Sequence, residues 1–264
     1  MKKNEIYIVP DKNDIEASLK ISREFDCGFE IQDFFDPAIL NDKKSIAKLI
    51  ELYQSLPCGH KKHIIHGAFF DLAANSQDTL IQQASKDRIR QSLHIAEALG
   101  AKGVVFHSNI IANFTSEFYI KSWVERTAAF YKELLREFSC DIYLENMFDA
   151  SPEALLQLMN HMENEQQRFG ICLDYGHVMT FGRDNQDWMK LARYIKHIHI
   201  SDNDLKQDLH LPIGSGQIDW NEFTRKITEN KINSSVLIEV KGEKNTKNSL
   251  NYMKTHLIFP FSDN

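Results

Sequence analysis

Two stretches of the chain decide its fold: GICLDYGH (170–177) and HIHIS (197–201). Each contains a short apolar run that predicts a buried strand, and a segment of helical character at 187–194 separates them. Strands joined through a helix run parallel, because the crossover returns the chain to the same end of the sheet. The two stretches therefore predict one strand–helix–strand unit of a parallel sheet.

The same alternation repeats along the whole chain. The predicted strands are Glu5–Val9, Phe29–Phe34, His63–Phe69, Gly103–His107, Ile142–Met147, Gly170–Asp174, His197–Ser201 and Val236–Val240. The predicted helices are Asp14–Phe25, Lys43–Leu56, Asp78–Leu99, Ser116–Phe138, Ser151–Met162, Asp187–Tyr194, Asp219–Glu229 and Asn248–Leu257. Eight such units fit a closed barrel of about 250 residues. We therefore expect one α/β domain over residues 1–264, a (β/α)₈ TIM barrel.

An open doubly wound sheet is the other architecture that this alternation allows. That fold usually has a glycine-rich turn after its first strand. Here the turn reads Pro10-Asp-Lys-Asn13, without glycine. The closed barrel is therefore favoured.

The amino-acid composition limits the kinds of partner that the protein is expected to bind. The 264 residues include 31 Lys and Arg against 37 Asp and Glu, which gives a net charge of −6. No segment concentrates basic side chains as a phosphate-binding surface does, so nucleic acid is disfavoured as a partner without being excluded. No run approaches the roughly 20 apolar residues of a membrane span, and the four cysteines lie far apart, as expected for reduced core thiols. We expect a cytoplasmic protein with no membrane partner, and a homo-oligomer stays open.

Side chains that could bind a metal stand at the carboxyl ends of six successive predicted strands. In a (β/α)₈ barrel these ends form the active-site face. The strand-end residues, with two from the loop after the seventh strand, are His66, His107, Glu145, Asp174, His177, His199, Glu239, Asp208 and His210. Imidazoles and carboxylates suit zinc and manganese, and so many polar groups at one barrel mouth need cations or substrate to neutralise them. The pattern predicts a functional metal site, since a chain of this length needs no structural metal.

The other histidines are expected to be structural. His197 lies two residues before His199 and therefore points to the same side one layer deeper, as a supporting or core residue. His63 has the opposite parity to His66. Core or surface positions are also expected for His60, His94 and His161.

Seven segments resemble the xylose-isomerase-like TIM-barrel superfamily, which joins sugar isomerases and epimerases with the endonuclease IV enzymes. They are HGAFFDL (66–72), GVVFHSN (103–109), YLEN (143–146), GICLDYGH (170–177), HIHISDND (197–204), DLHLPIGSGQIDW (208–220) and LIEV (237–240). The resemblance runs from about residue 28 to residue 240, and its most specific parts are the D-x-x-H and D-x-H pairs. It implies the barrel and metal dependence, and it leaves the substrate open.

The resemblance implies first a sugar or sugar-phosphate isomerase or epimerase, the function that the sequence favours. Such enzymes hold one divalent ion, here Zn²⁺ or Mn²⁺, with residues that match Glu145, Asp174, His199 and Glu239. The metal polarises a substrate carbonyl, while Glu145 and Glu239 act as the catalytic residues that pass a proton at the neighbouring carbon. The small-molecule substrate is expected to contact His66, Phe69, Phe70, His107, His177, His210 and Trp220.

The alternative is an endonuclease IV-like enzyme that cuts DNA at abasic sites. Such enzymes hold a cluster of zinc ions with nine side chains, and all nine have matches here. Two or three ions are then expected, with additional ligands in His66, His107, His177, Asp208 and His210. The negative net charge opposes this function, as do loops after the first two strands that are short and poor in basic residues.

Overall fold

The computed structural model of the chain describes residues 5–57, 62–182 and 187–262. Eight strands follow one another in chain order around a closed parallel barrel, which confirms the predicted architecture. The strands are β1 (Ile6–Ile8), β2 (Cys27–Ile31), β3 (Ile64–His66), β4 (Gly103–His107), β5 (Asp141–Glu145), β6 (Phe169–Asp174), β7 (Ile195–Ile200) and β8 (Ser235–Ile238). Strand β4 matches its predicted range residue for residue, and the others shift by one to three residues at their ends.

Helices connect the strands. The α-helices are α1 (Ile15–Phe25), α2 (Pro37–Leu40), α3 (Lys43–Gln54), α4 (Thr79–Ala98), α5 (Glu117–Glu137), α6 (Glu153–His161), α7 (Tyr175–Phe181), α8 (Trp220–Glu229) and α9 (Glu243–Thr255). Short 3₁₀ helices are η1 (Asp33–Phe35), η2 (Glu163–Glu165) and η3 (Trp188–Tyr194). Polar caps set several starts: Ser116 accepts a hydrogen bond from the Tyr119 amide, and Asp219 accepts two from the first turn of α8.

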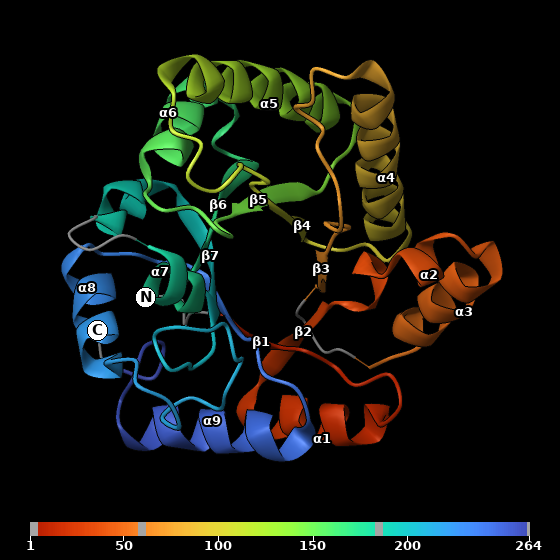
Figure 1. The fold of residues 1–264 in the computed structure, drawn as a ribbon. Coiled ribbons are helices and arrows are strands. Elements are labelled where there is room, and N and C mark those ends of the chain that lie inside the picture. The colour runs from red at the N-terminus through yellow and green to blue at the C-terminus, as the bar shows by residue number, and fades with distance from the viewer. Residues whose placement is uncertain (1–4, 58–61, 183–186, 263–264) are drawn as a thin grey trace. The chain divides into compact units, whose positions relative to one another are not determined.

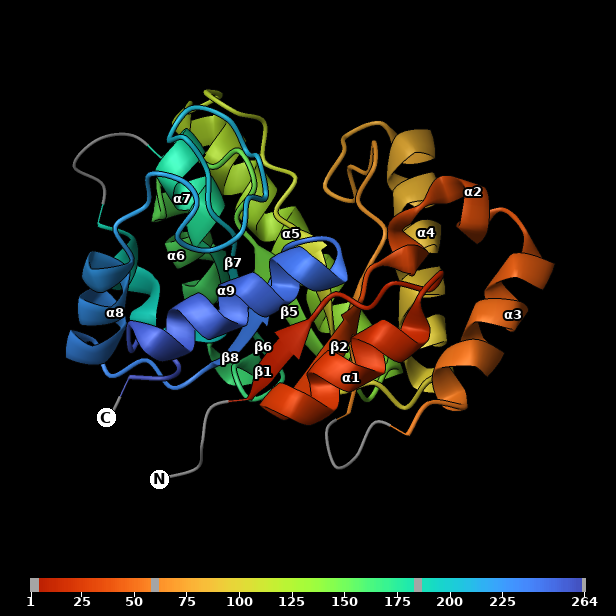
Figure 2. The ribbon, with the colours of Figure 1, turned by 90° about the horizontal axis from the view of Figure 1, so that it is seen from below.

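Contacts divide the chain into two compact units. The first unit comprises Met1–Glu30, Asn146–Pro152 and Ile171–Asn264, and the second comprises Ile31–Glu145 and Glu153–Gly170. In the first unit β1 pairs in parallel with β2 and β8, and β7 pairs with β6 and β8. Helices α1 and α9 lie side by side in this unit, as both views show (Figures 1 and 2). The prediction of one domain over residues 1–264 stays a prediction.

The second unit contains the ladder of β3, β4 and β5. Helix α4 packs on β4, and α5 runs beside α6 (Figure 1). The core here consists of large apolar side chains such as Phe106, Trp123 and Leu155, each no more than 1% exposed. Burial of this size is the main force that fixes the strand ends in place.

Several helical elements of the structure differ from the prediction. The helix predicted at 187–194 is the 3₁₀ helix η3, because its buried residues Trp188, Leu191 and Tyr194 recur every three positions, the period of that helix. A short helix that the sequence did not predict, α7, follows β6 directly, since Asp174 caps it. The last helix begins at Glu243 rather than at residue 248, after Gly242 turns the chain at φ 86°.

Other expectations concern the cysteines and the membrane. Cys27, Cys140 and Cys172 are buried, as expected for core cysteines, while Cys58 and His60 lie outside the described residues. Among the described residues, none of the helices combines the length and the apolar character that a bilayer crossing requires.

Candidate metal centre

Three successive strands of the second unit end in side chains that converge. Strand β3 ends at His66, β4 at His107 and β5 at Glu145, and all three residues are buried. Oε2 of Glu145 lies 3.4 Å from Nε2 of His66 and 3.5 Å from Nε2 of His107. The strand ends therefore assemble three of the nine predicted ligands into one cluster.

A backbone contact determines which nitrogen of His66 faces the carboxylate. Its Nδ1 lies 3.0 Å from the carbonyl oxygen of Gly67. Because a carbonyl only accepts, Nδ1 carries the hydrogen, and a neutral ring turns the lone pair of Nε2 towards Glu145. A lone pair then faces a carboxylate, an arrangement that a cation or a proton stabilises.

An aromatic group lies against this cluster. The Phe69 ring stacks on the His107 ring with centroids 4.3 Å apart and planes 28° apart. Phe70 and Phe35 contact Phe69 at centroid distances of 4.3 and 5.1 Å, and Phe70 is 49% exposed. Phe69 and Phe70 are predicted substrate contacts. Phe35, from η1, belongs to the same group, although the sequence analysis did not single it out.

The first unit holds a second cluster, formed by the D-x-x-H and D-x-H pairs. Oδ2 of Asp208 lies 3.2 Å from Nε2 of His177 and 3.0 Å from Nε2 of His210. Nδ1 of His177 is 2.9 Å from the carbonyl oxygen of Asn146, and Nδ1 of His210 is 3.0 Å from that of Glu239. Both Nδ1 atoms therefore donate to carbonyls, so both rings direct Nε2 at the same carboxylate oxygen.

The charges in this cluster are strongly coupled. Burial alone would raise the pKa of Asp208, but hydrogen bonds with His177 and His210 outweigh it and hold that pKa well below its usual value. Burial would also lower the pKa of His210, whereas the hydrogen bond to Asp208 and the charge of Glu239 raise it to about 10. The raised pKa of His210 and the lowered pKa of Asp208 favour a protonated imidazole beside a charged carboxylate, and a divalent ion binds such a pair by displacing the proton.

The cluster fits a metal ion in a second respect. The other carboxylate oxygen of Asp208, Oδ1, is buried and has no hydrogen-bond partner among the described residues. A buried oxygen of this kind is costly unless a cation or an ordered water satisfies it. Two imidazole nitrogens and a carboxylate are also a common zinc donor set.

Asn146 organises the neighbouring ligand Asp174. The Asn146 side chain accepts from the Asp174 amide and donates to the Asp174 carbonyl, both at 2.9 Å. Oδ1 of Asp174 in turn accepts from the His177 amide at 2.6 Å and caps α7. Asn146 thereby fixes both Asp174 and His177, a role that its place directly after Glu145 on the chain did not indicate.

A third buried cluster includes a residue that the sequence analysis missed. Glu30, in β2, has Oε2 2.8 Å from Nε2 of His197 and Oε1 3.2 Å from Nε2 of His199. Nδ1 of His199 lies 3.3 Å from Oε2 of Glu239. Burial would raise the pKa of Glu30, but the two imidazoles outweigh it and hold the pKa far below its usual value. The signal for Glu30 was available: an acidic residue inside the otherwise uncharged strand CGFEI.

Asp202 holds the loop that carries Asp208 and His210 through backbone and side-chain hydrogen bonds. The backbone groups of Asp202 pair with those of Leu211, and its carboxylate accepts from the amides of Gly214 and Ile218. The indole nitrogen of Trp220 also donates to this carboxylate, at 3.0 Å. Trp220 is only 3% exposed, so the structure gives it a part in holding the loop, and its contact with substrate stays a prediction.

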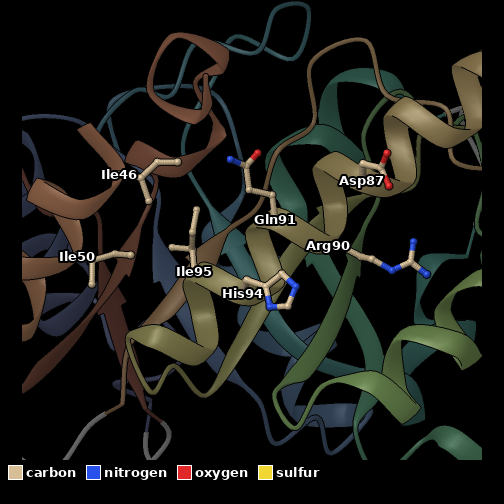
Figure 3. A pocket seen from close by; sticks show the side chains of 7 residues that line it. All are labelled: Ile46, Ile50, Asp87, Arg90, Gln91, His94 and Ile95. Atoms are coloured by element: carbon tan, nitrogen blue, oxygen red, sulfur yellow. The ribbon is translucent and has the colours of Figure 1, made fainter. Parts of the chain in front are cut away.

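A groove between α3 and α4 offers no such chemistry. Its volume is about 450 Å³, and its lining residues are Ile46, Ile50, Asp87, Arg90, Gln91, His94 and Ile95 (Figure 3). Arg90 is paired with Glu133 and Glu137. None of the nine predicted ligands lines it, and His94 packs against Phe138 as a structural residue.

The nine predicted ligands are thus distributed over both units. The second unit brings together His66, His107 and Glu145, and the first brings together His177, Asp208 and His210. Asp174, His199 and Glu239 also lie in the first unit and are at most slightly exposed. The single-ion set combines these three with Glu145 of the second unit, so that set stays a prediction.

The chain belongs to the xylose isomerase-like TIM barrel family, whose model matches residues 26–256. A probable endonuclease 4 of Mesomycoplasma hyopneumoniae is 27% identical over 183 residues, which cover 62% of this chain and 63% of that protein. A Thermus thermophilus protein whose crystal was soaked with zinc chloride has a TM-score of 0.73 at 24% identity and 97% coverage of both chains. A D-tagatose 3-epimerase-like protein has a TM-score of 0.72 at 22% identity, covering 95% of this chain and 96% of that one.

Proposed function

We propose that this protein is a multi-metal hydrolase of phosphate esters of the endonuclease IV type. The observation that carries the proposal is the cluster of His177, Asp208 and His210, in which both imidazoles direct Nε2 at the Asp208 carboxylate. In an enzyme with one ion bound by Glu145, Asp174, His199 and Glu239, His177 and His210 would contact the substrate, but Asp208 would have no assigned role. This preference departs from the sugar isomerase or epimerase that the sequence favours.

Each of the first two clusters would hold its own ion. His177, Asp208 and His210 would bind one ion, and His66, His107 and Glu145 another, while Asp174, His199 and Glu239 would complete the set. Bound divalent ions would supply Lewis acids that neutralise charge developing on a phosphoryl group. Asn146 and Gly67 hold the imidazoles in the ligating tautomer through their carbonyl oxygens.

The aromatic group would hold the organic part of the substrate. Phe69 stacks on His107, and Phe70 presents half of its surface to solvent, so a flat or apolar face can lie beside the phosphate-binding side chains. In abasic DNA the exposed deoxyribose or a neighbouring base would take this place. Abasic duplex DNA is therefore the first substrate to test.

A second candidate is the sugar or sugar-phosphate isomerase or epimerase. The net charge of −6 favours a small substrate over a polyanion. An aromatic wall beside imidazoles also suits the apolar face of a sugar ring. In this function Glu145 and Glu239 would exchange a proton with the carbon next to a carbonyl.

Metal counting and two activity assays separate the candidates. Protein purified without chelator is analysed for metal per chain, then incubated with an end-labelled duplex that carries one abasic site, and separately with ketose phosphates in heavy water. Asp208→Asn is the matched variant, since it keeps the size of the side chain and removes its charge. We expect at least two ions per chain and incision that Asp208→Asn abolishes.

The opposite pattern identifies the epimerase. One ion per chain, no incision, and deuterium incorporated at a carbon of the ketose would overturn the proposal in favour of the second candidate. DNA binding should also weaken with salt: the logarithm of the affinity should fall against the logarithm of the salt concentration with a slope of about −0.9 per phosphate contacted. Incision at the wild-type rate in the Asp208→Asn preparation would come from a contaminating nuclease and would overturn the proposal.

A further inference from the structure

Glu30 is a fully buried carboxylate inside an apolar strand. Its neighbours in β2, Phe29 and Ile31, are at most 1% exposed, and Glu30 itself is 0% exposed. A buried carboxylate is strongly destabilising unless hydrogen bonds and opposite charge compensate for its lost hydration. Two imidazoles of β7, those of His197 and His199, supply the hydrogen bonds. Because burial of this carboxylate is costly, we expect Glu30 to have a functional role.

The contacts of the two ring nitrogens of His199 indicate what that role is. Nε2 faces Glu30 at 3.2 Å, and Nδ1 faces Glu239 at 3.3 Å. A neutral imidazole has one donor nitrogen and one acceptor nitrogen. Donation from Nε2 to Glu30 leaves the lone pair of Nδ1 directed towards Glu239, which is itself a predicted ligand.

We infer that Glu30 is a positioning residue that holds His199 in the Nε2–H tautomer, so that Nδ1 is the nitrogen that binds the metal. Carboxylates commonly accept the second N–H of a metal-bound histidine, which orients the ring and makes the ligating nitrogen more basic. The inference rests on the proposed metal site at His199 and applies to the hydrolase and to the epimerase alike.

His197 gives Glu30 its own orientation. Its Nε2 lies 2.8 Å from Oε2 of Glu30, and its Nδ1 lies 2.7 Å from the hydroxyl of Ser235. The His197 and His199 rings are 5.1 Å apart and nearly perpendicular, as alternate residues of one strand. The sequence places His197 one layer deeper than the ligands, and the structure shows what it holds there.

A competing arrangement uses the same histidines. Donor atoms of Cys172, His197 and His199 also lie within 4.8 Å of one another and could hold a soft ion. In that case His197 and Cys172 are themselves ligands, and His199 turns Nε2 or Nδ1 towards them. Cys172→Ser therefore serves as the matched control, since it removes a buried side-chain group on β6 without touching Glu30.

The experiment measures Zn²⁺ affinity by competition with a chromophoric chelator in the wild type, Glu30→Gln and Cys172→Ser. We expect Glu30→Gln to lower the affinity of one site by about 10–100-fold, the usual effect of losing a carboxylate behind a ligating histidine. Cys172→Ser should bind as the wild type does. Nitrogen-15 NMR of the zinc-loaded wild type should show His199 ligated through Nδ1 with the hydrogen on Nε2, a readout that does not depend on how well Glu30→Gln folds.

The outcomes distinguish this inference from the proposed function. If the wild type binds zinc but His199 ligates through Nε2, or if only Cys172→Ser loses affinity, the role of Glu30 is refuted while the metal enzyme stands. If the wild type binds no zinc, both the role of Glu30 and the proposed metal enzyme are refuted.

Discussion

Replacement of Asp202 by Asn tests directly how the fold places Asp208 and His210. Oδ1 of Asp202 accepts from the amides of Asn203 and Ile218 at 2.9 and 3.2 Å. Oδ2 accepts from the Gly214 amide and the Trp220 indole at 2.8 and 3.0 Å. An asparagine has one oxygen and one NH₂ group, so two N–H donors would face another donor whichever way the amide is turned.

The size of the effect follows from those two lost hydrogen bonds. A hydrogen bond to a charged group contributes about 1.5–3 kcal/mol, and Asp202 is completely buried, so water cannot replace it. We expect the free energy of unfolding to fall by about 3–6 kcal/mol. The melting temperature should fall by roughly 2–4 °C for each kcal/mol lost. The loop from 202 to 218 should also lose its fixed position.

The assay is urea unfolding of metal-free protein, followed by zinc titration of the folded variant. Asp204→Asn is the control in the same loop, because its Oδ1 alone accepts from the Lys206 and Gln207 amides and an asparagine oxygen can keep that place. Asp204→Asn should leave the midpoint unchanged, whereas Asp202→Asn should shift it and weaken one zinc site. Equal midpoints for the two variants would show that the carboxylate of Asp202 does not hold the loop.

Three further predictions concern the ligands and one thiol. The double variant Asp208→Ala, His210→Ala should lose one ion per chain, measured by elemental analysis, and an unchanged count would remove these residues from the metal centre. Glu145→Gln and Glu239→Gln should each abolish turnover while thermal melting still reports a folded chain; near-wild-type turnover in either would exclude that glutamate from the chemistry. Burial, with the charge of Glu97, raises the pKa of the Cys140 thiol to about 11, so below that pH the thiol stays protonated. Peptide mapping after alkylation should find Cys140 unlabelled at about pH 8 in the folded protein, with labelling that rises as the pH approaches 11; rapid labelling near pH 8 would contradict its burial.

Strand ends were predictable from the sequence for a definite physical reason. Parallel strands joined by helices all finish on one face, so His66, His107 and Glu145 had to approach each other once the strands were recognised. Hydrogen-bond partners were not predictable, since the carbonyls that orient His177 and His210 belong to Asn146 and Glu239, 31 and 29 residues away along the chain.

Other features were missed because they depend on packing. Glu30 was recognisable as the acidic residue of a predicted strand, but its partners became known only from the fold, in which β7 places two imidazoles against it. The 3₁₀ character of η3 was hidden because a segment of seven residues is too short to separate a period of 3.0 from one of 3.6. Both cases involve a competition between local sequence signals and tertiary contacts, in which the contacts decide.

The net charge carries less weight against a phosphate substrate once the ligand clusters are considered. The value of −6 counts Glu145, Asp174, Asp208 and Glu239 as free carboxylates. Each divalent ion adds two positive charges, so one ion leaves the protein clearly negative, whereas three bring the formal charge to zero. The added charge would lie at the strand ends, where a phosphate would bind, rather than spread over the surface. The charge argument for a sugar substrate therefore assumes a single ion, and the same metal count that separates the two reactions also determines whether that argument holds.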